Sequence, residues 1–198
     1  LFLPGEASIS PAEIEAVLRG SVEAHKIADV EVAGFLSGGV DSAYLTALAR
    51  PARTYTISYA EPKYDESFPA RALARNLGLR NRVRCISPGE FWDAVPAVQY
   101  HMDEPMADAA AVALYFLNRE AARDVKVVLS GEGADELFGG YNIYRDPFTA
   151  RWYNRLPPWL RGGLGAAASL LPPGPGVNFL VRRGLSLEER YFGPTALL

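Results

Sequence analysis

The sequence predicts an α/β protein with a parallel sheet, helices on both faces of that sheet, and a helical C-terminal extension. Over residues 1–146, short β-branched or apolar runs alternate with helical patterns. Strands joined by helical crossovers form parallel sheets with right-handed connections. Residues 147–198 differ, because they contain six arginines, two acids and clusters of proline and glycine. We therefore expect two parts, 1–146 and 147–198, the second of them an incomplete helical extension.

The first helix is expected to begin directly after Ser10. Ser10 can cap it, Pro11 suits the first helical position, and Glu13 completes a capping box. Apolar residues then recur at helical spacing, namely Ile14, Val17, Leu18 and Val22.

Four strands and four further helices follow. Residues 54–59 are β-branched or aromatic except for Ser58. Gly78 can end the helix that precedes it, and the apolar run 125–129 is typical of a buried strand. The expected strands are 32–36, 54–59, 82–86 and 125–129, and the expected helices are 41–49, 66–77, 89–101 and 109–123.

Composition excludes several classes of protein. The chain has 198 residues, of which 49% are apolar and 22% charged, and no apolar run approaches the roughly 20 residues that span a bilayer. Its net charge of -3 argues against a nucleic-acid partner. The single cysteine, Cys85, cannot form an internal disulfide, which favours the cytoplasm. Because the sequence starts at Leu1 without a methionine, we expect a piece of a longer protein.

Two glycine-containing loops follow expected strands, and the first is Ser37-Gly38-Gly39-Val40-Asp41-Ser42. Glycines let successive N–H groups turn inward, and the next helix directs its positive end to the same place. Ser37 and Ser42 add hydroxyl donors. This pattern predicts a phosphate cradle, although the Gly-Lys-Ser/Thr of a Walker loop is absent.

Asp41 would repel a phosphate held in this loop unless a cation lay between them. Mg²⁺ prefers oxygen ligands of this kind. The loop therefore predicts a metal-bound pyrophosphate, and it resembles the pyrophosphate loop of the ATP pyrophosphatases.

The second loop, residues 130–141, reads Ser-Gly-Glu-Gly-Ala-Asp-Glu-Leu-Phe-Gly-Gly-Tyr. Its three carboxylates would raise one another's pKa unless a divalent cation or a cationic substrate compensated them. Leu137 and Phe138 indicate partial burial. In parallel sheets, ligands bind beyond the carboxyl ends of strands where strand order reverses. If the first and fourth strands flank that point, both loops face one cleft.

Together the loops resemble the synthetase half of the glutamine-hydrolysing asparagine synthetases, and the segment 129–141 is close to that family's signature. The segments 103–108 and 64–67 resemble two further family segments, and Glu189-Arg190-Tyr191 resembles the start of its helical extension. The resemblance implies an adenine nucleotide alpha hydrolase-like, PP-loop domain over 1–146.

The resemblance also implies roles for individual residues. The pyrophosphate part of ATP would be held by Ser37, Gly38, Gly39, Asp41 and Ser42, Mg²⁺ by Asp41 and Asp135, and the adenosine by Leu36, Ile57 and Gly131. Glu132 would face the aspartyl-adenylate, and Glu132 and Asp135 would be the catalytic residues.

The implied reaction has two steps. The side-chain carboxylate of aspartate attacks the α-phosphorus of ATP and releases pyrophosphate, and ammonia from glutamine then displaces AMP. Mg²⁺ and the N–H cradle would stabilise charge on the departing pyrophosphate. The implied partners are an N-terminal glutaminase domain, with a homodimer left open.

Three departures from the family pattern limit what this chain alone is expected to do. The glutaminase domain is absent, no lysine follows Tyr141, and Leu79-Arg80 stands where histidine is frequent. We therefore expect ATP binding but little or no amide synthesis. The alternatives are a β-lactam or peptide-cyclising relative, an RNA-modifying ATPase, and a non-catalytic nucleotide-binding module.

Other features are interpreted as structural. Cys85, Phe91, Trp92 and Tyr100 are expected in the core, and His25 and His101 at the surface. Asp103, Glu104 and Asp108 fit a cleft rim and a helix cap equally well.

Overall fold

The computed structural model describes residues 9–105, 108–145, 149–186 and 189. It divides into two compact units, Leu1–Glu132 and Gly133–Leu198, and each is described by itself. The compositional boundary expected between residues 146 and 147 falls within the second unit, and as a domain boundary it stays a prediction.

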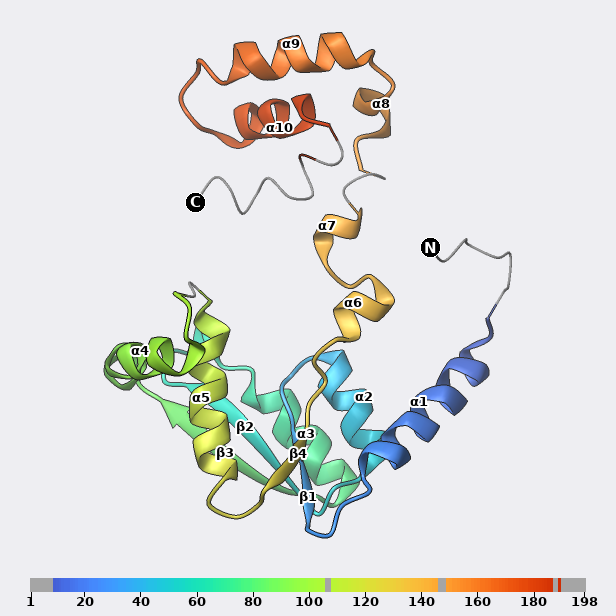
Figure 1. Cartoon of the computed structure of the whole chain (residues 1–198), viewed down its shortest axis with the longest axis vertical. Helices are drawn as coiled ribbons and strands as arrows, with labels where there is room; N and C mark the ends of the chain where they lie inside the picture. Colours follow the sequence, from blue (N-terminus) through green and yellow to red (C-terminus); the bar gives the residue numbers. More distant parts are fainter. Residues whose placement is uncertain (1–8, 106–107, 146–148, 187–188, 190–198) are drawn as a thin grey trace. The chain divides into compact units, whose positions relative to one another are not determined.

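The first unit is built on a four-stranded parallel sheet (Figure 1). Its strands are β1 (Val32–Phe35), β2 (Arg53–Tyr59), β3 (Arg80–Ile86) and β4 (Val127–Leu129). Their order is β3-β2-β1-β4, with Gly34 of β1 opposite Thr54 on one side and Leu129 on the other. The predicted parallel sheet is confirmed, and β1 is the strand at which the order reverses.

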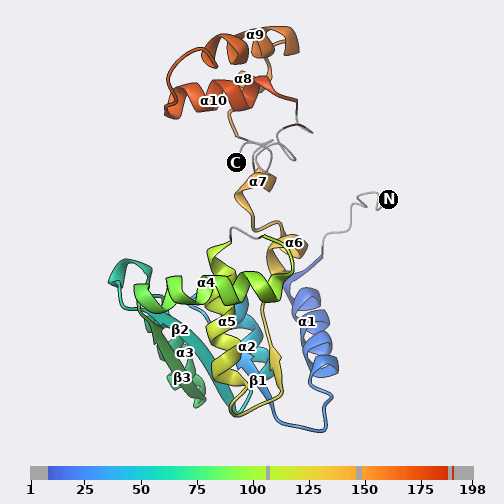
Figure 2. The same ribbon diagram turned by 60° about the vertical axis from the view of Figure 1, so that its left-hand side comes forward.

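Helices cover both faces of this sheet, as predicted (Figure 2). The helix α5 (Ala109–Ala121) packs on β2 and β3, with α4 (Pro88–Met102) beside it. The opposite face carries α2 (Val40–Ala49) and α3 (Ser67–Leu77), and α1 (Pro11–His25) packs against α2. A short 3-10 helix, η1 (Pro62–Tyr64), follows β2.

Local sequence signals explain where the helices begin and end. The capping box predicted at Ser10 and Glu13 is present, and an equivalent box at Ser87 and Glu90 starts α4. Gly78 ends α3 with a φ of 70°, in the left-handed region that favours glycine.

Three apolar clusters form the core of the first unit. One lies under β1 and β2 around Phe35 and Tyr55, and a second joins β3, α4 and α5 around Ile86 and Phe116. The third packs Leu36 against α3. These clusters fix the first loop, which begins directly after Leu36, to a rigid base.

Two predictions of core positions on strands are wrong. The strand β4 is half-buried along its length, because it is an edge strand of the sheet formed by the described residues. Cys85 is exposed, since β3 is the other edge strand and successive side chains point to opposite faces, so Ile86 takes the buried position.

Aromatic residues of α4 also depart from expectation. Phe91 packs against the cluster around Ile86, but Trp92 is 69% exposed and Tyr100 is 80% exposed. The buried stripe of α4 is formed by Ala94 and Val98, and Trp92 and Tyr100 lie outside it. Their predicted core positions are therefore wrong.

The second unit is helical. It contains α6 (Ala134–Phe138), α7 (Asn142–Arg145), α8 (Arg151–Asn154), α9 (Pro158–Ala168) and α10 (Pro175–Gly184). The predicted helical extension is confirmed in α8 to α10. The helices α9 and α10 approach closely where Gly165 meets Gly184, since a Cβ at either position would lie 3.0 Å from the other residue's Cα. Over the described ranges, no helix has the length and apolar character that crossing a membrane requires.

Candidate functional site

The predicted site lies at the carboxyl ends of β1 and β4. The chain passes from β1 through β2 to β3 and then returns to place β4 on the other side of β1. This is a topological switch point, where ligands of parallel α/β sheets bind. The prediction that the first and fourth strands flank the switch point is confirmed.

The first loop is held in shape by its two serines. The Ser37 and Ser42 hydroxyl oxygens lie 2.8 Å apart, and the Ser37 N–H donates to the Ser42 Oγ at 3.1 Å. The Ser37 Oγ also accepts a hydrogen bond from the Gly39 N–H at 3.1 Å. These bonds close the loop on itself at the start of α2.

Gly38 is required by close packing and not by an unusual backbone conformation. Neither Gly38 nor Gly39 has a positive φ, so their backbone conformation is open to other residues. Gly38 instead lies against the start of α3, because a Cβ there would be 2.9 Å from both the Glu66 carbonyl oxygen and the Pro69 Cγ. Close packing excludes a side chain at this position.

The beginning of the second loop contacts the first loop directly. A Cβ on Gly131 would lie 3.0 Å from the Ser42 backbone nitrogen and 3.2 Å from the Asp41 carbonyl carbon. The backbone that leaves β4 therefore passes over the first turn of α2. Glycine at position 131 leaves this approach open.

The start of α2 presents hydrogen-bond donors that its own helix does not use. The first N–H groups of a helix have no acceptor within it, and no side chain caps α2 at Gly39. Val40, at 81% exposure, and the exposed Asp41 leave this end accessible. The free N–H donors and the helix dipole at this end of α2 fit a bound phosphate group.

Leu36 directly follows β1, and Ile57 lies in the neighbouring strand β2. Leu36 is 2% exposed, its N–H donates to the Tyr55 carbonyl, and its carbonyl accepts from the Thr56 hydroxyl at 2.7 Å. Ile57 is half-buried against the Ile86 cluster. The Leu36 backbone groups are thus used by the protein itself, and adenosine contacts at either residue stay predictions.

Asp135 lies in the second unit, near the start of α6. Gly133 and Gly139 bound this helix with φ values of 92° and 67°. The Asp135 carboxylate folds over Gly140, whose N–H donates to the Asp135 carbonyl at 3.0 Å. Any side chain at Gly140 would collide with this carboxylate. Asp41 belongs to the first unit, so the predicted magnesium pair stays a prediction.

Other parts of the second loop are open to solvent. Glu132 is exposed, and Leu137 and Phe138 are 80% and 58% exposed, so their predicted partial burial is wrong. Both residues belong to α6, a short helix with no buried residue. The Tyr141 hydroxyl donates to Glu136 at 2.7 Å, which lowers the pKa of Glu136 and raises the pKa of Tyr141 to about 12.

The three acidic residues before α5, Asp103, Glu104 and Asp108, have different structural environments. Asp108 caps α5, because its carboxylate accepts from the Ala110 N–H at 2.9 Å. Asp103 ends α4 with a φ of 60°, and Glu104 is exposed. The cap interpretation therefore holds for Asp108. Met106, Ala107, Arg190 and Tyr191, which contribute to two of the family resemblances, lie outside the described residues.

Sequence reasoning missed how the acidic turn after β2 meets the first loop. The Asp65 carboxylate accepts from the Ser67 N–H at 2.9 Å, a bond that lowers the pKa of Asp65. The next residue, Glu66, places its carbonyl against Gly38. The signal was the acidic turn 64–67, but its neighbour in space could not be read from spacing. Within the described ranges, no group of three metal-ligating side chains is assembled.

These features define a parallel α/β protein in which Gly131, after β4, contacts the start of α2 at the switch point of the sheet. Comparison with known proteins gives the family. The Asparagine synthase family model matches residues 13–191, and the chain belongs to this family.

Curated relatives include putative glutamine-hydrolysing asparagine synthetases of Mycobacterium bovis and Mycobacterium tuberculosis, each 47% identical over 91% of this chain. Asparagine synthetase 1 of Bacillus subtilis is 39% identical over the same share. The chain spans 28–29% of the length of these relatives. Among solved structures, an NMN synthetase from Francisella tularensis matches 69% of this chain and 61% of its own at 17% identity, with a TM-score of 0.48.

Proposed function

We propose that this chain is the ATP-binding part of an enzyme that forms an amide from aspartate and ammonia through a β-aspartyl-adenylate. The observation that most directly supports this proposal is the contact of Gly131 with Asp41 and Ser42 at the start of α2. It joins the two loops that resemble the family's signatures next to unused helix donors. Family membership supports the same chemistry, since the relatives are asparagine synthetases.

The first loop would hold the pyrophosphate part of ATP. Ser37, Gly38, Gly39 and Ser42 would surround the pyrophosphate, and Asp41 would bind Mg²⁺ from its exposed position. The Ser37 and Gly39 N–H groups close the loop on itself, so the donors would be the serine hydroxyls and the first N–H groups of α2. A magnesium ion, when bound, would offset negative charge on the leaving pyrophosphate. Fixed N–H donors would do the same without reorganisation, because the clusters under β1 hold the loop in place.

Other roles rest on the resemblance. Leu36, Ile57 and Gly131 would lie near the adenosine, Glu132 would face the adenylate, and Asp135 would be the second magnesium ligand. In the longer protein, ammonia would come from glutamine through an N-terminal glutaminase domain. We place the reaction in the cytoplasm, where a lone exposed cysteine such as Cys85 stays reduced.

Calorimetry of Asp41→Asn tests the proposal. The wild-type chain should bind ATP in a Mg²⁺-dependent manner, and Asp41→Asn should weaken that binding by about tenfold or more, since a metal ligand is lost. The melting temperature should stay unchanged because the Asp41 side chain is exposed. Asp29→Asn, also at an exposed position, is the matched control. Equal Mg-ATP affinity in Asp41→Asn would contradict the metal role.

Substrate choice needs the full-length protein. Pyrophosphate exchange should be driven by aspartate and not by a panel of other carboxylates. Exchange with a different carboxylate would favour a β-lactam or peptide-cyclising relative. Absence of Mg²⁺-dependent ATP or AMP binding by the chain would favour a non-catalytic scaffold whose function is carried by partners.

A further inference from the structure

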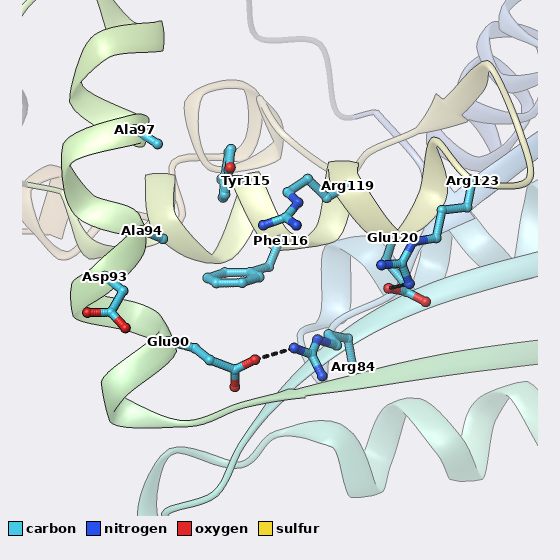
Figure 3. Close-up of a pocket in the computed structure, with 10 residues that line it drawn as sticks. All are labelled: Arg84, Glu90, Asp93, Ala94, Ala97, Tyr115, Phe116, Arg119, Glu120 and Arg123. Carbon is cyan, nitrogen blue, oxygen red and sulfur yellow. Dashed lines mark hydrogen bonds and ion pairs between the residues drawn. The ribbon is translucent and has the colours of Figure 1, made fainter.

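A cavity lies in the first unit, and its lining includes no residue of either loop. It has a volume of about 300 Å³ and is formed by residues of α4, α5 and β3 (Figure 3). None of its lining residues belongs to the predicted ATP site. Its volume lies at the lower end of the range for small-molecule sites, which suits a ligand of metabolite size.

Most of the charged side chains in this cavity neutralise one another. Arg84 forms an ion pair with Glu90 (Figure 3). Glu120 pairs with Arg123 at 2.7 Å and also with Arg82, which approaches from β3, at 2.9 Å. Two charged residues of the lining are not part of these ion pairs, the positively charged Arg119 and the negatively charged Asp93.

Arg119 is oriented by aromatic rings and not by a carboxylate. Its guanidinium lies 5.3 Å from the Tyr115 ring centre and 5.9 Å from the Phe116 ring centre. Among the ion pairs of the described residues, none involves Arg119. These cation–π contacts involve the charge of the guanidinium, whose planar fork of N–H donors matches a carboxylate in a bidentate manner.

Asp93 provides the opposite charge from α4. It is exposed, and no hydrogen bond or ion pair joins it to another residue in the part of the chain that the structure describes. Ala94 and Ala97 follow it along the cavity wall, and the buried Phe116 lines the side formed by α5 (Figure 3). Ala94, Ala97 and Phe116 thus give the cavity an apolar wall in addition to its two charged side chains.

We propose that this cavity binds a free α-amino acid with a small or medium uncharged side chain. Its carboxylate would pair with Arg119, its ammonium with Asp93, and its side chain would contact Ala94 and Phe116. A zwitterion can pair with both charged side chains, whereas a simple anion or a simple cation can pair with only one of them. This inference is independent of the proposed ATP site.

Ligands that differ by one charge test the proposal. NMR titration of the full 198-residue chain with L-valine should give saturable shifts at Ala94 and Ala97. N-acetyl-L-valine lacks the ammonium and L-valine methyl ester lacks the carboxylate, so each should bind about tenfold more weakly, or about 1.4 kcal/mol. Equal binding of either derivative would overturn the proposal, and so would no saturable binding of L-valine, L-alanine or L-asparagine.

Variants assign the two contacts. Arg119→Gln and Asp93→Asn should each weaken L-valine binding about tenfold, and Arg119→Lys should retain part of it because the positive charge remains. Arg75→Gln and Asp29→Asn change exposed residues outside the cavity and should bind as the wild type does. Unchanged affinity in Arg119→Gln or Asp93→Asn, with an unchanged melting temperature, would contradict the assignment.

Discussion

Gly38 is the residue of the first loop whose identity the packing determines. The Glu66 carbonyl oxygen and the Pro69 Cγ both lie where its side chain would begin. The carbonyl belongs to the backbone at the start of α3, so it cannot move aside as the end of a flexible side chain could. The shape of the predicted phosphate loop therefore depends on α3 as well as on α2.

Replacing Gly38 by alanine should lower both stability and ATP affinity. We expect a loss of about 1–3 kcal/mol in the free energy of unfolding, because overpacking displaces the loop or the start of α3. Urea unfolding and calorimetry with Mg-ATP measure the two effects. Gly20→Ala is the control, since nothing lies within 4 Å of a Cβ there, and it should stabilise α1 by about 0.5–1 kcal/mol. Wild-type values in Gly38→Ala would contradict the packing argument.

At the scale of elements, α4 depends on the capping box at its start. The Ser87 Oγ accepts from the Glu90 N–H at 3.3 Å, and the Glu90 carboxylate accepts from the Ser87 N–H at 3.0 Å. Glu90 also pairs with Arg84 of β3, so the same carboxylate joins the helix start to the sheet. The hydrogen bonds from Ser87 are the main cause of the lowered pKa of Glu90.

Ser87→Ala should therefore destabilise the first unit by about 1 kcal/mol, the usual cost of losing a serine cap. Chemical unfolding gives the free energy directly. Ser21→Ala, at an exposed position within α1, should leave stability nearly unchanged. A loss in Ser21→Ala as large as that in Ser87→Ala would show that the cap is not responsible.

At the scale of the whole first unit, a network around Asp124 joins three segments of the sheet. The Asp124 Oδ2 accepts from the Tyr55 hydroxyl at 3.0 Å and from the Arg82 Nη1 at 2.6 Å. The Arg53 Nη1 lies 3.6 Å from the Asp124 Oδ2. Arg53 also pairs with Glu31, just before β1, at 2.6 Å. The hydrogen bond from Tyr55 is the largest cause of the lowered pKa of Asp124, followed by the Arg82 charge.

This lowered pKa predicts how stability depends on pH. Because the folded state holds the Asp124 proton less tightly than the unfolded state does, its contribution is complete above the unfolded pKa of about 3.9. It is lost as the pH falls through the lower, folded pKa. Thermal unfolding between neutral and acid pH should thus show a shallower decline for Asp124→Asn than for the wild type. Equal slopes would show that Asp124 does not contribute.

The sequence by itself determined the order and type of the elements in the first unit. Capping residues, Gly78 and the apolar runs carry these signals locally, so the structure reproduces the helices and strands within a few residues. The motifs 37–42 and 129–141 likewise indicated the family, because their residue types and spacing are specific. The cap role of Asp108, which the sequence left undecided, required the observed hydrogen bond to Ala110.

Only the tertiary structure decided which residues are buried and which loops meet. Cys85 is exposed because β3 is an edge strand, and Trp92 is exposed because it lies outside the buried face of α4. The local sequence pattern encodes neither the strand order nor the buried helix face. The same holds for the contacts of Gly38 with Glu66 and of Gly131 with Ser42, which join residues far apart in the chain. Spacing along a chain fixes local geometry, whereas long-range neighbours follow from how the strands are ordered and how the helices pack upon them.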